Sequence, residues 1–187
     1  MTNFIQRTNT TADLNLMLQD FEAVISAIGW PKKVDAFGRT LSSNQIGLTH
    51  RPGAEDQSLD NVGSLFGQIV AKESEFSEFN DLLGSYTRNA IMQLCKDEGI
   101  EVGRIRYMKL QEKTGLTVHK DSEVRYHFVL KTNPNAFFGE KVEDSDLAAK
   151  CYHIPADGCF YKVDTTRDHF VYNGSRSDRI HLVICTL

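Results

Sequence analysis

A histidine and a carboxylate two positions apart are the first candidates for chemistry in this chain. His119 and Asp121 point to the same side of an extended strand, because successive side chains alternate between its faces. His169, far downstream, supplies a third ligand. Two histidines and one carboxylate hold non-haem Fe(II) on one octahedral face and leave the other positions open. The spacing therefore predicts a metal centre with His119, Asp121 and His169 as its ligands and catalytic residues; zinc is the chemical rival.

Cationic side chains accompany these candidate ligands. Arg125 and His127 share one face of a predicted strand over 124–131. On another predicted strand, Arg179 follows His169 by ten positions and shares a face with His181, opposite Ile180 and Leu182. A cation that faces a packed interior is costly without an anionic partner, and a guanidinium meets a carboxylate with two parallel hydrogen bonds. These residues favour a site for an anionic co-substrate, and hence iron over zinc. For Arg125 and His127, a surface ion pair to Asp121 or Glu123 is the alternative.

The motifs around these residues resemble a known family. The run Arg104 to Asp121, the Arg125-Tyr-His127 triplet, and the segment from His169 to Val183 resemble the aspartyl/asparaginyl β-hydroxylase branch of the Fe(II)- and 2-oxoglutarate-dependent oxygenases. The resemblance covers roughly the C-terminal half of the chain.

The resemblance implies a co-substrate and a role for each cation. It implies Fe(II), 2-oxoglutarate and dioxygen, with ascorbate as an optional reductant. Arg179 would contact the distal carboxylate of 2-oxoglutarate, and Arg125 and His127 would help to bind it near the metal. Met108 stands where some relatives carry a small hydroxyl residue, so that hydrogen bond is missing here or comes from Tyr107 or Lys109.

The expected function is hydroxylation of an amino acid, or of an aspartyl or asparaginyl residue in a peptide or protein. The animal members of the family lack the carboxylate that Asp121 supplies, and they carry long helical repeats that this chain lacks. A smaller substrate than a folded domain is therefore expected. Two alternatives remain: a cupin-like module that binds a metal or ligand without catalysis, and a zinc-dependent barrel enzyme without redox chemistry.

Composition limits the class of protein. The 187 residues are 41% hydrophobic and 25% charged with a net charge of −4, which is typical of a globular domain and does not favour nucleic-acid binding. Residues 1–187 are predicted to form one domain. No apolar run approaches the roughly 20 residues of a membrane span, and no signal peptide is recognised, so a cytoplasmic protein is expected. The four cysteines form no metal-binding or disulfide pattern. The oligomeric state is not predicted.

The pattern of apolar residues predicts helices followed by strands. Helical spacing indicates amphipathic helices over 13–28, after a cap at Thr10 or Thr11, and over 78–98. A short strand at 44–48 precedes a loop over 49–57 that is predicted to be exposed. Its His50 and Arg51 are candidates for contact with a substrate, and a solvated turn is the alternative. Beyond residue 103 the chain reads as short strands with turns between them, at 104–110, 124–131, 148–153, 159–164, 170–173 and 179–186. This order predicts a mainly β protein with flanking helices: a double-stranded β-helix, or jelly-roll, cupin-like barrel over 103–187, supported by N-terminal helices within 11–99.

Overall fold

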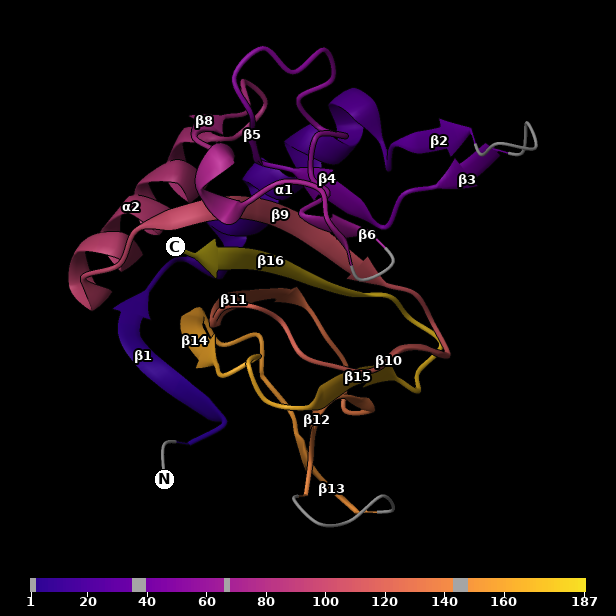
Figure 1. The fold of residues 1–187 in the computed structure, drawn as a ribbon. Helices are drawn as coiled ribbons and strands as arrows, with labels where there is room; N and C mark the ends of the chain where they lie inside the picture. The colour runs from indigo at the N-terminus through magenta and orange to yellow at the C-terminus, as the bar shows by residue number, and fades with distance from the viewer. Residues whose placement is uncertain (1–2, 35–39, 66–67, 143–147) are drawn as a thin grey trace.

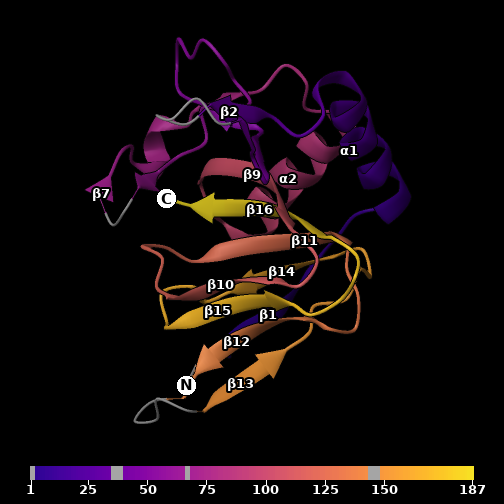
Figure 2. The same ribbon diagram turned by 90° about the vertical axis from the view of Figure 1, so that its right-hand side faces the viewer.

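The structure is a computed structural model that describes residues 3–34, 40–65, 68–142 and 148–187. Its main body is a pair of facing antiparallel sheets, with both helices on the outer side of the larger sheet (Figures 1 and 2). The larger sheet has the order β1 (Ile5–Thr11), β14 (Cys159–Val163), β11 (Arg125–Lys131), β16 (Arg179–Thr186), β9 (Val102–Leu110), β4 (Gln45–Gly47). The smaller sheet has the order β10 (Thr114–His119), β15 (His169–Asn173), β12 (Ala136–Lys141), β13 (Ala149–Tyr152).

This arrangement confirms the predicted fold class. The paired sheets form a double-stranded β-helix, the jelly-roll of the cupins. Among the described strands, no hydrogen-bonded ladder joins one sheet to the other, so the two sheets form an open sandwich rather than a closed barrel.

Short elements complete the N-terminal part. The helices are α1 (Leu14–Ile28) and α2 (Ser85–Glu98), and a 3-10 turn covers Glu73–Glu75. Three small ladders join β2 (Lys32–Val34) to β3 (Thr40–Ser42), β5 (Thr49–His50) to β8 (Glu78–Phe79), and β6 (Ser64–Leu65) to β7 (Gln68–Ile69). The β2–β3 hairpin projects from the side of the molecule (Figure 1).

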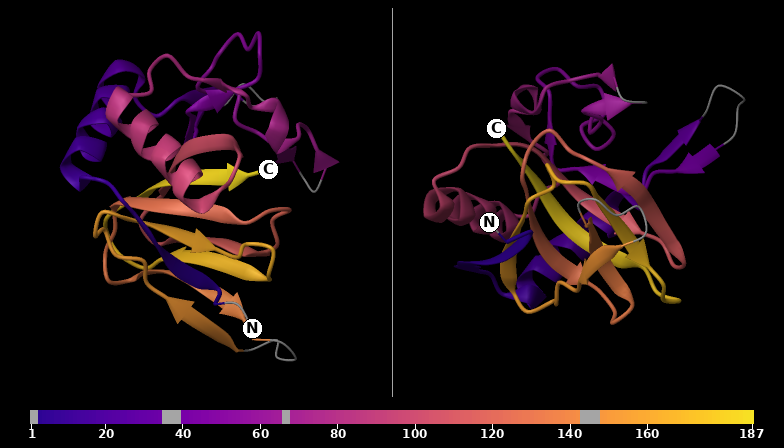
Figure 3. Two further views of the ribbon diagram at one scale, coloured as in Figure 1. Left: turned by 90° about the vertical axis from the view of Figure 1, so that its left-hand side faces the viewer. Right: turned by 60° about the horizontal axis from the view of Figure 1, so that its bottom comes forward.

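The two faces of the larger sheet differ because side chains alternate along each strand. On β16, Ile180, Leu182 and Ile184 point outward and pack beneath the helices. Figure 3 shows α1 and α2 side by side over this face. The apolar stripes predicted for the helices are thus part of the core, with Met17, Phe21, Val24, Ile91 and Leu94 fully covered. The inner face instead carries buried cations and imidazoles, among them Arg106, Arg179 and His181.

The first helix begins later than predicted. The Asp13 side chain accepts hydrogen bonds from the backbone N–H groups of Asn15 and Leu16 and so caps α1. Thr10 and Thr11 belong instead to β1, a strand that the sequence did not predict. At the other end, Gly29 has a φ of 63°, which favours glycine and ends the helix as predicted.

The second helix is shorter than its periodicity predicted. The prediction of 78–98 was wrong at its start, since Glu78–Phe79 forms β8 and α2 begins at Ser85. The Asn80 side chain explains the difference: its Oδ1 accepts a hydrogen bond from the N–H of Leu82, while its Nδ2 donates to the carbonyl of Gly47. A buried asparagine that competes for backbone groups in this way favours a turn over a helix.

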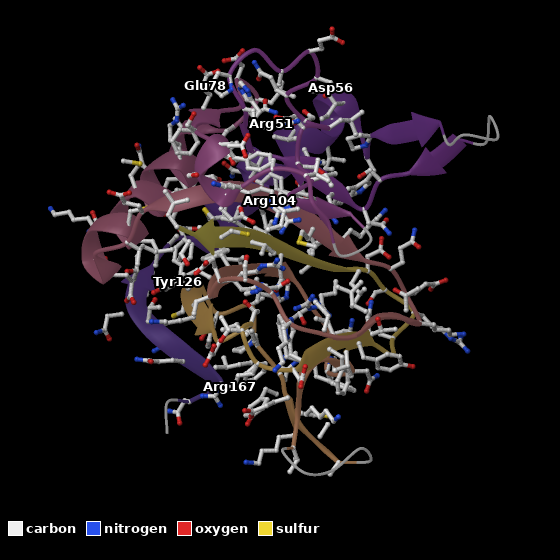
Figure 4. All side chains as sticks on the ribbon, in the orientation of Figure 1. Arg51, Asp56, Glu78, Arg104, Tyr126 and Arg167 are labelled. Carbon is white, nitrogen blue, oxygen red and sulfur yellow. The ribbon has the colours of Figure 1, made fainter. Side chains whose placement is uncertain are left out.

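A buried ion pair anchors the N-terminal segment to the larger sheet. Arg104 of β9 donates from Nη2 to Oε1 of Glu73 at 2.6 Å and from Nη1 to the carbonyl of Asn61 at 3.2 Å, and Figure 4 shows Arg104 directly above β16. A Glu73→Ala variant leaves this arginine buried without its carboxylate. We expect the free energy of unfolding in urea to fall by about 3–5 kcal/mol. An exposed Glu55→Ala control should stay within about 0.5 kcal/mol of wild type; equal stability of the two variants would contradict the anchoring role.

Candidate metal centre

A cavity of about 280 Å³ lies between the inner faces of the two sheets. Strands from both sheets supply its walls, and the six residues predicted from the sequence to bind metal or co-substrate all lie in or beside it. Its lining residues are Asn44, Gln45, Met108, Lys109, Leu110, Gln111, Thr114, Gly115, Leu116, His119, Arg125, His127, Phe138, Thr165, His169, Val171, Arg179 and Val183.

The three predicted ligands converge at this cavity. His119 and His169 face each other across the β10–β15 ladder with ring centroids 4.3 Å apart, and donor atoms of His119, Asp121 and His169 lie within 4.8 Å of one another. The predicted reason for this grouping was partly wrong. Strand alternation was expected to place His119 and Asp121 on the same face, but β10 ends at His119 and Asp121 lies beyond the strand. The backbone N–H of Asp121 donates to the carbonyl of Thr165, and this hydrogen bond holds the turn after β10 so that the carboxylate lies beside the two histidines.

Backbone carbonyls orient both imidazoles. Nδ1 of His119 lies 2.7 Å from the carbonyl oxygen of Thr117, and Nδ1 of His169 lies 2.9 Å from that of Arg167. Since a carbonyl only accepts, each Nδ1 carries the proton and each Nε2 offers a lone pair. Both Nε2 atoms face Asp121, at 3.9 Å from His119 and 3.7 Å from His169. Burial also lowers the pKa of His169, which favours its neutral, metal-binding form.

Only one oxygen of the Asp121 carboxylate has a partner. Its Oδ1 forms an ion pair with Nη2 of Arg125 at 2.7 Å, whereas its Oδ2 is buried without a hydrogen-bond partner. A buried carboxylate oxygen without a partner is costly, and a cation beside two imidazole lone pairs would satisfy it. The donor set therefore fits a divalent metal ion with one carboxylate oxygen and two histidine Nε2 atoms as ligands.

Arg125 and His127 point inward from β11. The ion pair considered as an alternative for Arg125 does form with Asp121, but the two side chains are only 18% and 11% exposed and Arg125 lines the cavity, so the pair is not on the surface. His127 is 5% exposed, and its Nε2 is buried without a partner. Burial, followed by the nearby charge of Arg179, holds the pKa of His127 well below its usual range, so this imidazole is neutral at pH 7.

Arg179 reaches the same cavity from the start of β16. It is 8% exposed and lies over the ring of Phe138, with 4.9 Å from Cζ to the ring centroid. Among the described residues, no carboxylate lies within 4.0 Å of it; its Nη2 is 3.1 Å from Nδ1 of His181. Burial lowers the pKa of Arg179 to about 9. The site thus keeps a buried guanidinium that an anionic ligand would stabilise.

The strand faces decide which neighbours reach this arginine. Met108 lines the cavity, as its predicted position requires. Tyr107 points to the outer face and packs edge-on against Phe21. Lys109 lines the cavity, but its ammonium lies over the ring of Trp30. These contacts favour the other alternative, that the hydroxyl of relatives has no replacement here.

Other residues singled out from the sequence lie elsewhere. The 49–57 loop begins as strand β5, so His50 is buried and not exposed as predicted. Arg51 pairs with Asp60 beside a separate hollow of about 480 Å³ that shares no residue with the cavity, and in the view of Figure 4 it lies in the upper, N-terminal part of the molecule. Neither His50 nor Arg51 contacts the candidate ligands. Three further polar residues have partners outside the ligand set. His153 contacts the carbonyl of Ala136, Asp168 the ammonium of Lys120, and Asn173 three backbone carbonyls.

Three residues of the site were given no role in the prediction. Phe138 comes from β12, a strand that was missed although its residues Ala136, Phe137 and Phe138 are apolar. Thr165 reaches the cavity through the turn that holds Asp121. His181 is buried beside Arg179, and its place on the same predicted strand face was the available signal.

The two buried histidines of the larger sheet predict a pH dependence of stability. Burial holds the pKa of both His127 and His181 well below 6.5, so the unfolded chain takes up these protons first. Their contribution is complete above pH 6.5 and is lost as the pH falls below it, by about 1.4 kcal/mol per pH unit for each histidine. Between pH 6.5 and 5, urea unfolding of a His181→Leu variant should show a smaller loss than wild type. Equal slopes in this variant and in wild type would contradict this account.

The chain is similar to known proteins in sequence family and in fold. The family model described as aspartyl/asparaginyl beta-hydroxylase matches residues 70–186. A comparison of the whole sequence with curated proteins finds no match. The structure is similar to an oxidoreductase of the 2OG-Fe(II) oxygenase family from Burkholderia pseudomallei (TM-score 0.54, 11% identity, 90% of this chain and 77% of that one). It is also similar to the non-heme monooxygenase ThoJ in its apo form (TM-score 0.56, 12% identity, 100% of this chain and 74% of that one). A third similar structure is AviO1 from Streptomyces viridochromogenes (TM-score 0.53, 12% identity, 98% of this chain and 89% of that one).

No helix in the described part of the chain meets the length and apolarity that crossing a membrane requires.

Proposed function

Because the chain belongs to the aspartyl/asparaginyl β-hydroxylase family, we propose that it is an Fe(II)- and 2-oxoglutarate-dependent dioxygenase. Its substrate in this proposal is an amino acid, or an aspartyl or asparaginyl-type residue of a peptide or protein. The family membership and the 2OG-Fe(II) oxygenase fold support the broader class of hydroxylase.

One observation carries the proposal: an open metal-ligand triad and an uncompensated arginine share one cavity. His119, Asp121 and His169 offer three ligand atoms within 4.8 Å of one another, the donor set that in non-haem iron sites leaves the other positions open. Arg179 lines the same cavity and lacks a carboxylate partner among the described residues. A ligand that chelates a metal at one end and carries a carboxylate at the other, as 2-oxoglutarate does, matches both features.

In this proposal the residues of the chain bind the metal ion and the co-substrate and orient them. The backbone carbonyls behind His119 and His169 keep both Nε2 atoms turned to the position that the metal would occupy. Arg125 holds one oxygen of Asp121 and leaves the other for the ion. His127 and Arg179 flank Phe138, whose ring lies 5.0 Å from the imidazole of His127 and would shield a bound co-substrate from water. When bound, iron would supply the oxidative decarboxylation of 2-oxoglutarate to succinate, coupled to hydroxylation of a C–H bond by dioxygen.

The test is succinate formation from 2-oxoglutarate. Protein reconstituted with Fe(II) in the presence of ascorbate and oxygen should release succinate even without the second substrate, and amino acids and peptides can then be screened for an oxygen-dependent gain in mass. 2-Oxoglutarate binding without succinate release would favour the cupin-like binding module. Activity or binding that requires zinc, with no response to 2-oxoglutarate, would favour the non-redox enzyme. Either result overturns the proposal.

A further inference from the structure

His181 is the one side chain within hydrogen-bond distance of Arg179 among the described residues. It lies two positions along β16 on the same inner face, and it is 1% exposed. Nη2 of Arg179 is 3.1 Å from Nδ1 of His181, and Nδ1 of His127 lies 3.4 Å from the same atom. The function proposed above leaves His181 unassigned.

The contact determines which nitrogen of His181 carries the proton. A guanidinium has only N–H donors, so Nδ1 of His181 must accept, and the proton of the neutral ring is on Nε2. Burial and the adjacent charge of Arg179 keep this imidazole neutral. His181 therefore orients the guanidinium through a neutral acceptor.

Two other arginines of the same face are held by carboxylates. Arg104 pairs with Glu73 and Arg125 with Asp121, so their charges are compensated inside the protein. Arg106 resembles Arg179 in having a neutral partner, Oε1 of Gln45, but it is not among the residues that line the cavity. A neutral acceptor fixes the direction of Arg179 and leaves its charge for a ligand. We propose that His181 is the positioning residue that keeps Arg179 oriented and uncompensated, so that the cavity selects a ligand with a distal carboxylate. This inference rests on the proposed use of 2-oxoglutarate.

Three substitutions separate orientation from charge. In His181→Asn the amide oxygen takes the place of Nδ1, in His181→Leu no acceptor remains, and His181→Asp places a carboxylate there. The measurement is the dissociation constant of 2-oxoglutarate for Mn(II)-loaded protein, with the Mn(II) dissociation constant determined in parallel. We expect the Asn variant to bind within about 3-fold of wild type, the Leu variant about 10- to 100-fold more weakly, and the Asp variant not detectably, because its carboxylate compensates Arg179. Mn(II) affinity should not change.

The outcomes distinguish this inference from the function on which it rests. If wild type binds 2-oxoglutarate and the Leu variant binds it equally well, or the Asp variant binds as well as the Asn variant, the role of His181 is overturned and the function stands. If wild type fails to bind 2-oxoglutarate, both are overturned.

A spectroscopic readout tests the contact without substitution. In ¹⁵N-labelled wild-type protein, the imidazole of His181 should carry its proton on Nε2 and a bare lone pair on Nδ1 at pH 7. Protonation of Nδ1 overturns the inference, because a protonated Nδ1 cannot accept from Arg179.

Discussion

Substitution of His119 by alanine is expected to abolish tight binding of Fe(II). The variant removes one of three ligand atoms, and loss of a group that merely orients a ligand already costs about 10- to 100-fold in metal affinity, so a larger loss is expected here. His119 suits the experiment because its side chain is 34% exposed, whereas that of His169 is 2% exposed and packs in the interior. Calorimetry with Fe(II) under anaerobic conditions measures the effect.

A His153→Ala variant is the matched control for His119→Ala. His153 is exposed, and its Nδ1 contacts the carbonyl of Ala136 outside the cavity lining. Its iron affinity should equal that of wild type. Chelation of the metal should lower the melting temperature of wild type and of His153→Ala but not that of His119→Ala, since an ion that binds only the folded state stabilises it. Wild-type iron affinity in His119→Ala would exclude this triad as the metal centre.

Substitution of Arg179 by alanine should spare the metal and weaken 2-oxoglutarate by about 2–5 kcal/mol, which corresponds to roughly 30-fold to a few thousand-fold. The ligand carboxylate would remain buried beside Phe138 without its charged partner. An Arg179→Lys variant keeps the charge but loses the two-pronged geometry, so an intermediate affinity is expected. Titration of 2-oxoglutarate into Mn(II)-loaded protein gives these values, with the exposed Arg176→Ala as a control that binds as wild type.

The stability of the Arg179 variants tests the same site independently. Without ligand, the buried guanidinium has a neutral partner in His181, so its charge is poorly compensated. An apolar side chain of similar length removes that cost, and Arg179→Met should therefore unfold at the same or a higher urea concentration than wild type. Parallel loss of metal binding and stability in Arg179→Ala would show instead that this residue maintains the fold.

Local patterns in the sequence determined much of the architecture. Alternation on β16 predicted that Arg179 and His181 point away from Ile180 and Leu182, and the outward residues do pack beneath the helices. Helical spacing predicted α1 and the body of α2, because a lone amphipathic helix must bury its stripe against a neighbour. The grouping of His119, Asp121 and His169 also followed from residue type and spacing, and the structure brings them together.

Long-range contacts decided the rest. The start of α2 depends on Asn80 bonding to Gly47, which lies 33 positions earlier, and no local periodicity records such a bond. Asp121 reaches the histidines through a turn bonded to Thr165, not through strand alternation. The neutral partner of Arg179 is likewise a property of packing: sequence spacing placed His181 on the inner face, but only the facing sheets bury both side chains and leave no carboxylate beside them in the described structure. Sequence thus determined which groups face inward, and the tertiary structure decided which of their charges are compensated, because compensation depends on neighbours that are distant along the chain.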